Sequence, residues 1–302
     1  KEAGIKLPER HLGLVPAQEK RQDTGLYDRL RALVEKNIDL RRILKISEKA
    51  LRLTRTDALN VLSLRESPPK ADDRSNLKNG IASPSARNDK IEVTIAIARD
   101  KAFNFYYQDN LDILKNLGAR LVEFSPLNDK SLPAGIDGMY IGGGYPELFS
   151  AQLSSNRRMR EVVSDYAKKG LPIYAECGGL MYLVKRIVDF NGKAFPMCGV
   201  FDCSAVMADK RQALGYIEIE VRKDNILSRK GDKIRAHTFH WSYLKDLSKD
   251  IRFTYKVTKG KDRVYEDGLI KENVLASYAH LHFASNINWA RNFIKSCLTY
   301  KA

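Results

Sequence analysis

The sequence predicts an α/β protein built on an open, mostly parallel sheet that is flanked by helices and preceded by a partial α/β segment. Two observations indicate this fold class. Beyond residue 90, short apolar runs alternate with helix-like segments, and before it the apolar segments are too few to close a core. With 302 residues, 43% of them hydrophobic, the chain suffices for one large or two moderate domains.

The first 65 residues look like the end of a larger domain. Residues 12–16 read as a short strand that runs into a turn, because the proline at the end cannot donate to a central ladder. In residues 26–53 leucine, isoleucine and valine recur near helical spacing, which predicts one long helix or a helix pair broken near Asn37 or Asp39. A strand and a helix cannot enclose a core unaided.

Residues 66–90 are rich in Pro, Ser, Asn, Asp and Lys, which predicts a mobile, protease-sensitive interdomain linker. Residues 91–302 then form one α/β domain. Its first expected elements are strand Ile91–Ala98, helix Asn110–Leu117, strand Arg120–Phe124, strand Gly138–Ile141, helix Arg157–Lys169 and strand Leu171–Ala175. This order predicts a parallel sheet with right-handed crossovers. Further extended segments, expected to be antiparallel, lie at Tyr216–Arg222 and Phe253–Val257.

The charge balance is basic but unfocused. Lys and Arg number 52 against 37 Asp and Glu, a net charge of +15. Basic residues are scattered among acidic ones, and no basic run is interleaved with aromatic residues, which favours a solvated surface over a nucleic-acid site. Such a surface would also suit a polycarboxylate substrate.

Neither a membrane span nor a secretion signal is evident. No run approaches the roughly 18 apolar residues that a membrane helix needs, and the N-terminus lacks the order of a signal peptide. The cysteines Cys177, Cys198, Cys203 and Cys297 form no C-x-x-C pair, which favours a reducing compartment. We therefore expect a soluble, cytoplasmic protein that binds neither nucleic acid nor membranes, with Cys198 and Cys203 as core thiols.

Cys177 is the strongest candidate for a nucleophile. A predicted strand runs directly into Glu176-Cys177-Gly178-Gly179 and then a helix. A cysteine on such a sharp strand-to-helix turn is lifted to the carboxyl edge of the sheet. The helix dipole lowers the pKa of the thiol there, and the backbone N–H of Gly178 points to where an oxyanion would form. The alternative is that Cys177 has no chemical role and is simply a small residue that fits a tight turn.

A second glycine cluster, Gly142-Gly143-Gly144, follows the predicted strand 138–141, at an edge where open α/β sheets bind ligands. Neither phosphate-loop nor dinucleotide-loop spacing occurs there, so Gly143 or Gly144 is better interpreted as the second oxyanion donor. The base must come from one of two histidine pairs. These pairs are His237 with His240 and His280 with His282. Each pair could also be read as metal ligands, but no third ligand cluster is evident, so no metal is expected.

Three separated segments resemble one known family. They read IGGGYPE, AECGGLMYL and SYAHLHFASN. Together they are similar to the class I glutamine amidotransferase domain of cobyrinic acid a,c-diamide synthases and their relatives, including cobyric acid synthase and nickel-sirohydrochlorin a,c-diamide synthase. The resemblance covers most of residues 91–302, and LPERHLGLV at residues 7–15 looks like the end of that family's ATP-dependent synthetase domain. It implies that residues 1–65 are the C-terminal remnant of that domain.

The resemblance implies that Cys177 attacks the glutamine side-chain amide, forming a thioester and releasing ammonia. His280 would raise the nucleophilicity of the cysteine and protonate the leaving ammonia. His282 is the second candidate, and it occupies the place where many class I amidotransferases carry a triad glutamate. The third group is therefore missing or supplied elsewhere. The family's G-H-E-F-H-Y-S stretch appears here as AHTFHWS, which keeps His240 as a secondary candidate.

The implied function is the glutamine-hydrolysing part of an ATP-dependent amidoligase acting on the a- and c-side-chain carboxylates of a corrinoid or related tetrapyrrole. No cofactor is expected in this chain; ATP and Mg²⁺ are expected for the full synthase, with an N-terminal ATP-binding synthetase domain or subunit as partner. The acceptor is left open among cobyrinate, hydrogenobyrinate and nickel-sirohydrochlorin, and a homodimer is compatible with the sequence. The alternatives are a cysteine hydrolase or peptidase of the same fold without ammonia transfer, and a non-catalytic binding module.

Overall fold

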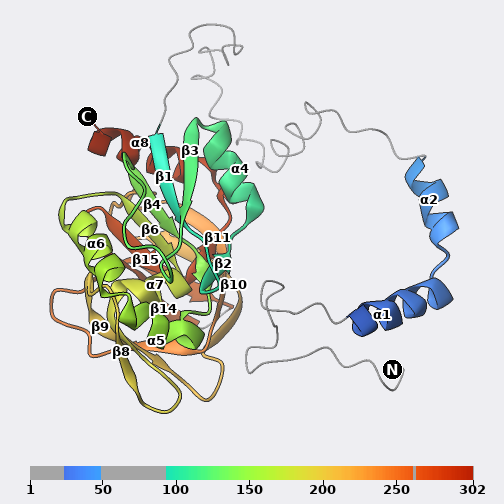
Figure 1. Ribbon diagram of the computed structural model, residues 1–302. Coiled ribbons are helices and arrows are strands. Elements are labelled where there is room, and N and C mark those ends of the chain that lie inside the picture. The colour runs from blue at the N-terminus through green and yellow to red at the C-terminus, as the bar shows by residue number, and fades with distance from the viewer. Residues whose placement is uncertain (1–23, 49–92, 261–262, 302) are drawn as a thin grey trace, which may run out of the picture. The chain divides into compact units, whose positions relative to one another are not determined.

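The computed structural model describes residues 24–48, 93–260 and 263–301 (Figure 1). The chain divides into two units, Lys1–Asn88 and Asp89–Ala302, and each is described by itself. The strand predicted at residues 12–16 and the linker predicted at residues 66–90 lie outside the described residues.

Two helices, α1 (Thr24–Asn37) and α2 (Leu40–Glu48), make up the described part of the first unit. Of the two alternatives predicted for residues 26–53, the helix pair with a break near Asn37 or Asp39 is confirmed as far as Glu48, and residues 49–53 lie outside the described residues. The side chain of Asp39 accepts a hydrogen bond from the backbone N–H of Arg42 at 3.0 Å, so it satisfies a donor in the first turn of α2. None of the described residues of α2 is buried, so its apolar side chains are exposed.

The second unit is built on a ten-stranded sheet (Figure 1). In spatial order its strands are β16 (Ala279–Leu281), β11 (Lys233–His240), β10 (Ala213–Val221), β13 (Arg252–Lys259), β14 (Arg263–Lys271), β15 (Val274–Ser277), β6 (Ile173–Glu176), β4 (Gly138–Ile141), β1 (Val93–Ala98) and β3 (Ala119–Phe124). Neighbouring strands are parallel from β3 to β15 and antiparallel from β15 to β16.

The parallel half is the α/β sheet that the sequence predicts. Every residue of β1, β4, β6 and β15 is buried, because both faces of this half are covered and no strand there can alternate with polar residues. The antiparallel half is more extensive than the two predicted segments, which overlap β10 and β13. Strands β11 and β14 escape detection in the sequence because more than half of their residues are exposed or only partly buried, which leaves no long apolar run.

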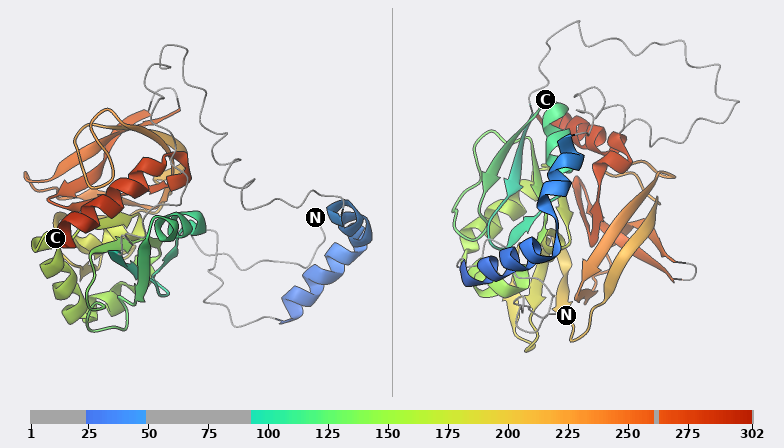
Figure 2. Two further views of the ribbon diagram at one scale, coloured as in Figure 1. Left: turned by 90° about the horizontal axis from the view of Figure 1, so that it is seen from above. Right: turned by 90° about the vertical axis from the view of Figure 1, so that its right-hand side faces the viewer.

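Helices cover both faces of the parallel half (Figures 1 and 2). They are α4 (Gln108–Asn116), η3 (Pro146–Phe149), α5 (Ser150–Ser155), α6 (Arg157–Lys168), α7 (Gly178–Leu183), η4 (Phe283–Ser285) and α8 (Ile287–Lys301). One core cluster joins α4 and α8 to side chains such as Ile95, and the other joins α5, α6 and α7 to side chains such as Ala96. None of the helices in the described ranges is both long and apolar enough to cross a membrane.

A four-stranded sheet extends the second of these clusters. Its strands, in spatial order, are β12 (Ser242–Lys245), β9 (Phe201–Met207), β7 (Val184–Val188) and β8 (Ala194–Pro196). Strand β7 begins directly after α7, and the hydroxyl of Ser242 in β12 contacts the sulfur of Met181 in α7 at 3.4 Å. This sheet therefore supports the helix that follows the candidate nucleophile.

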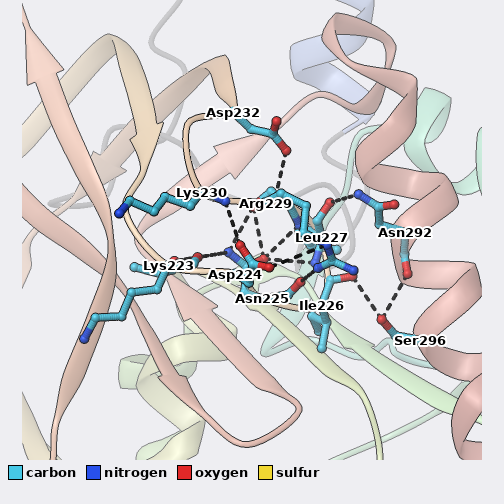
Figure 3. Close-up of polar contacts among 12 residues, drawn as sticks. Lys223, Asp224, Asn225, Ile226, Leu227, Arg229, Lys230, Asp232, Asn292 and Ser296 are labelled. Atoms are coloured by element: carbon cyan, nitrogen blue, oxygen red, sulfur yellow. Dashed lines mark hydrogen bonds and ion pairs between the residues drawn. The ribbon is translucent and has the colours of Figure 1, made fainter.

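The loop between β10 and β11 is held to α8 by a polar network (Figure 3). The Asn225 side-chain oxygen accepts hydrogen bonds from the backbone N–H groups of Leu227 and Ser228 at 2.9 and 3.1 Å. Asn292 in α8 donates its side-chain amide to the Leu227 carbonyl at 2.8 Å, and the Ser296 hydroxyl lies 3.2 Å from the Ile226 carbonyl. These contacts anchor the antiparallel half of the sheet to the helix that covers the parallel half.

Candidate active site

Cys177 lies on the sharp turn between β6 and α7. Its backbone angles are φ 46° and ψ −100°. A non-glycine residue at positive φ costs of order 1–3 kcal/mol and persists only where its surroundings hold it. The Cys177 N–H donates to the Ser277 carbonyl at 2.7 Å, which joins the turn to the end of β15. Cys177 is 8% exposed, and its sulfur lies 3.6 Å from the Phe239 carbonyl oxygen.

The two residues after Cys177 must be glycines, because the backbone passes too close to its neighbours for a side chain. A Cβ on Gly179 would lie 2.2 Å from the carbonyl oxygen of Ile141. A Cβ on Gly178 would lie 2.9 Å from Pro146 Cδ and 3.0 Å from the backbone nitrogen of Gly144. The turn at Cys177 is thus packed directly against the second glycine cluster.

That second cluster forms β5 (Gly143–Gly144), which pairs antiparallel with β2 (Phe103–Phe105). A Cβ on Gly144 would lie 2.0 Å from the Ala102 carbonyl oxygen, and one on Gly143 would lie 2.7 Å from Cε1 of His280. The glycines predicted as oxyanion donors therefore surround the same point as Cys177 and His280. The N–H of Gly142 is already donated to the Tyr106 hydroxyl at 2.9 Å.

His280 is a buried residue in the middle of β16. Its strand pairs with β11, where His237 is its register partner, and the Phe105 ring meets the imidazole edge-on at 4.9 Å between centroids. Burial lowers the pKa of the imidazole, but the neighbouring Cys177 thiol and Glu176 carboxylate outweigh it and raise the pKa of His280 to about 10. The imidazole is therefore protonated near neutral pH, the form that stabilises a thiolate.

The bend that precedes His280 is held by a buried carboxylate that sequence reasoning missed. Asp267, 4% exposed, accepts hydrogen bonds from the Ser277 hydroxyl at 2.8 Å and from the backbone N–H groups of Tyr278 and Ala279 at 3.1 and 3.3 Å. Burial raises the pKa of this carboxyl group, although the hydrogen bonds oppose the shift. No short-range pattern marks this residue, because its partners lie about ten positions further along the chain.

Glu176 is the second buried carboxylate at this site, and the sequence assigned it no role beyond preceding the nucleophile. It is 1% exposed at the end of β6, and its Oε2 lies 3.8 Å from Nδ1 of His280. The available signal was a charged residue at the end of an otherwise apolar buried strand, since acidic residues are almost never fully buried without partners.

Of the other three candidate histidines, His237 lies in β11 opposite His280, and His240 and His282 make contacts of their own. Strand β16 ends at Leu281, so strand alternation no longer places His282 beside His280. Nε2 of His282 instead lies 3.1 Å from the Asp109 carboxylate. His240 stacks on the Tyr278 ring at 3.9 Å, and its Nδ1 lies 2.7 Å from the Ser242 carbonyl oxygen. Burial lowers the pKa of His240 to about 4, so it is uncharged near neutral pH.

The remaining cysteines are free thiols in the core, and the prediction that Cys198 and Cys203 are core thiols is confirmed. Burial raises the pKa of Cys203 to about 12 and raises the pKa of Cys198 and of Cys297 well above the usual range. Within residues 24–48, 93–260 and 263–301, no group of three or more His, Cys, Asp or Glu side chains could hold a metal ion.

A glutamine-analogue electrophile such as a diazo-ketone should therefore label Cys177 and leave the other three cysteines unmodified. The reactive species is the thiolate, and a buried thiol with a raised pKa supplies almost none of it. Peptide mapping by mass spectrometry after labelling measures the distribution. Denatured protein, in which all four thiols are accessible, is the control. A label found chiefly on Cys198 or Cys203 in the folded protein would remove Cys177 as the nucleophile.

Comparison with known proteins identifies a matching family and similar proteins. The family model described as CobB/CobQ-like glutamine amidotransferase domain matches residues 94–287. The cobyrinate a,c-diamide synthase of Caldanaerobacter subterraneus is 36% identical over 301 residues, covering 99% of this chain and 60% of the relative. The protein of the same name from Dehalococcoides mccartyi is 41% identical over 294 residues, covering 96% of this chain and 58% of the relative. The chain thus spans under two thirds of the length of these relatives.

Solved structures resemble the fold. One described as a glutamine amidotransferase has a TM-score of 0.51 at 17% identity and covers 67% of this chain and 98% of its own. PurLQS from Thermotoga maritima has a TM-score of 0.51 at 15% identity, with 69% and 98% covered. At such identities the likeness concerns the fold alone, and the class I amidotransferase-like α/β fold expected from the sequence is confirmed.

Proposed function

This chain belongs to the family of CobB/CobQ-like glutamine amidotransferase domains, and from that premise we propose that it hydrolyses glutamine at Cys177 and supplies the ammonia for amide synthesis on a corrinoid. The observation that carries this proposal is the convergence at one point of Cys177, His280 and the glycines of both clusters. A strained nucleophile, a protonated imidazole and backbone donors are the groups that acyl transfer from an amide requires.

In the proposed reaction the Cys177 thiolate attacks the side-chain carbonyl carbon of glutamine. The carbonyl electrons move to oxygen, and the backbone N–H groups of Gly178 and of Gly143 or Gly144 stabilise that oxyanion. The carbon–nitrogen bond then breaks, and ammonia leaves with a proton from His280. Water attacks the resulting glutamyl thioester while His280 accepts a proton, and the carbon–sulfur bond breaks to release glutamate and the free thiol.

The proposed acceptor is cobyrinate, at its a- and c-side-chain carboxylates, because the relatives that cover this chain are named cobyrinate a,c-diamide synthase. ATP and Mg²⁺ are assigned to a synthetase domain or subunit that acts with this one, because the relatives are named synthases and this chain covers only 60% and 58% of their length. Cytoplasm is the proposed compartment, because all four cysteines are free thiols, as in a reducing environment.

The test uses either the full-length enzyme or this chain together with its synthetase subunit. Cobyrinate, ATP, Mg²⁺ and glutamine are added as substrates. Mass spectrometry should find two carboxylates converted to amides, with one glutamate released for each amide. Hydrogenobyrinate and nickel-sirohydrochlorin serve as competing acceptors, and amidation of one of these in preference to cobyrinate would overturn the acceptor. Peptide cleavage without glutamine hydrolysis would overturn the amidotransferase and favour a cysteine peptidase.

A further inference from the structure

The carboxylate of Glu176 sits in a dry pocket of hydrogen-bond donors. Its Oε1 accepts from the backbone N–H of Leu281 at 2.9 Å and from the Tyr174 hydroxyl, and its Oε2 accepts from the Tyr140 hydroxyl at 2.9 Å. Burial raises the pKa of Tyr140 and of Tyr174 well above the usual range, so both phenols remain neutral donors. Donors aimed at a carboxyl group from three directions complement a negative charge.

One nitrogen of the His280 imidazole, Nδ1, faces Glu176. This nitrogen is buried and has no hydrogen-bond partner, which is costly for a polar atom in the interior. The ion pair of that nitrogen is with Glu176, at 3.8 Å. This separation exceeds the usual upper limit of an N–H···O hydrogen bond by roughly 0.6 Å, and catalytic hydrogen bonds are often long in free enzymes and tighten when substrate binds.

We propose that Glu176, the residue directly before the nucleophile, is the positioning carboxylate that orients His280 and completes the catalytic group. This inference rests on the proposed function, since it assigns the third member of the same site. In a Ser-His-Asp site the buried carboxylate holds the imidazole in the tautomer whose other nitrogen faces the nucleophile. We assign the same role to Glu176, which faces Nδ1 of His280 and accepts a hydrogen bond from its N–H when the two side chains close together on substrate binding.

The position two residues after His280 cannot serve this purpose. It is occupied by His282, which pairs with Asp109 at the surface rather than with the base. Asp267, the other buried carboxylate, is committed to the Ser277 hydroxyl and to backbone N–H groups of the bend. Among the described residues, Glu176 is therefore the carboxylate that faces the free nitrogen.

Glu176 also sets the spacing between the two reacting side chains. It is covalently attached to Cys177, and through the Leu281 N–H it holds the residue next to His280. One side chain thus connects the nucleophile turn at the end of β6 with β16, which lies at the far end of the strand order of the same sheet. A displacement of the base strand relative to the thiol would break this hydrogen bond in a medium without water to replace it.

The first measurement compares Glu176→Gln with the wild-type chain. The substitution keeps size and a hydrogen-bond acceptor but removes the charge. We expect the kcat for glutamine hydrolysis to fall at least about 10-fold, though less than the roughly 10⁴-fold seen when a serine-protease triad loses its carboxylate. The thiolate of cysteine depends less on the base than a serine hydroxyl does. KM should change little, because the buried carboxylate does not reach the substrate.

Asp109→Asn is the matched control, since it makes the same chemical change beside the other histidine of the stretch, at a carboxylate that is 70% exposed. Its kcat should equal that of the wild type. A folded Glu176→Gln variant with wild-type kcat, or an Asp109→Asn variant with the larger loss, would overturn the proposal.

The second measurement needs no glutamine, and its first part needs only the wild-type chain. Nitrogen-15 NMR of histidine-labelled wild-type protein should show a proton on Nδ1 of His280 at neutral pH, and in Glu176→Gln the signals of that nitrogen and proton should shift. An unprotonated Nδ1 in the wild type would overturn the assignment even if the Gln variant failed to fold. Absence of glutaminase activity in the wild type would count against the proposed function instead, and the NMR result would still decide the role of Glu176.

Discussion

Replacing Cys177 with alanine should abolish glutamine hydrolysis, with residual turnover lower by a factor of order 10⁴ or more, as for loss of a catalytic nucleophile. The variant should fold, because alanine fills less space than cysteine and the turn is held by the Cys177 backbone hydrogen bond to Ser277, which any residue but proline can make. Glutamate release, measured with circular dichroism as a check of folding, gives the result.

If the proposed function holds, the same Cys177→Ala change in the full-length enzyme should leave amide synthesis intact when ammonium chloride replaces glutamine. Ammonia added from outside bypasses the thioester, so only the glutamine-dependent reaction depends on the thiol. Cys203→Ala is the control, since it removes a buried thiol, 1% exposed, that is remote from the turn in sequence and has no assigned chemistry. Glutamine-dependent amidation by a folded Cys177→Ala enzyme would show that the nucleophile lies elsewhere.

Replacing His280 with alanine should cut the kcat for glutamine hydrolysis by a factor of order 100 or more, the usual scale for losing a positioned general acid and base. In the proposed reaction His280 carries the proton that ammonia takes, and the raised pKa of its imidazole keeps the charge that would stabilise a Cys177 thiolate. His282→Ala should reduce turnover only a few-fold, because this side chain is 37% exposed and pairs with Asp109 at the surface. Ammonia release from both folded variants measures the difference.

The opposite ranking, with His282→Ala inactive and His280→Ala near normal, would assign the base to His282. His240→Ala is a useful third variant. Its imidazole is uncharged near neutral pH and stacks on Tyr278, so its loss should affect stability more than turnover. Thermal unfolding and glutaminase assays on the same preparation separate these two effects.

Much of the fold was predictable, because the parallel strands and their helices have local signatures. Strands buried on both faces, such as β1 and β4, read as continuous apolar runs, and the break between α1 and α2 follows from Asp39, which caps the second helix. The four-stranded sheet and most of the antiparallel half were not predictable. Their strands alternate buried and exposed residues over short lengths, and their pairing depends on contacts between distant segments.

By itself the sequence determined the sharp turn at Cys177 and the two glycine clusters. A cysteine between a buried strand and two glycines is a local arrangement, and its backbone geometry follows from the neighbouring residues. Tertiary structure alone decided which histidine faces the thiol and which carboxylate faces that histidine. His280 and His282 are two residues apart, yet the end of β16 between them turns one toward Cys177 and the other toward Asp109. Glu176 meets His280 across more than a hundred residues of chain, because β15 pairs with β6 and places Ser277, three residues before His280, opposite Glu176.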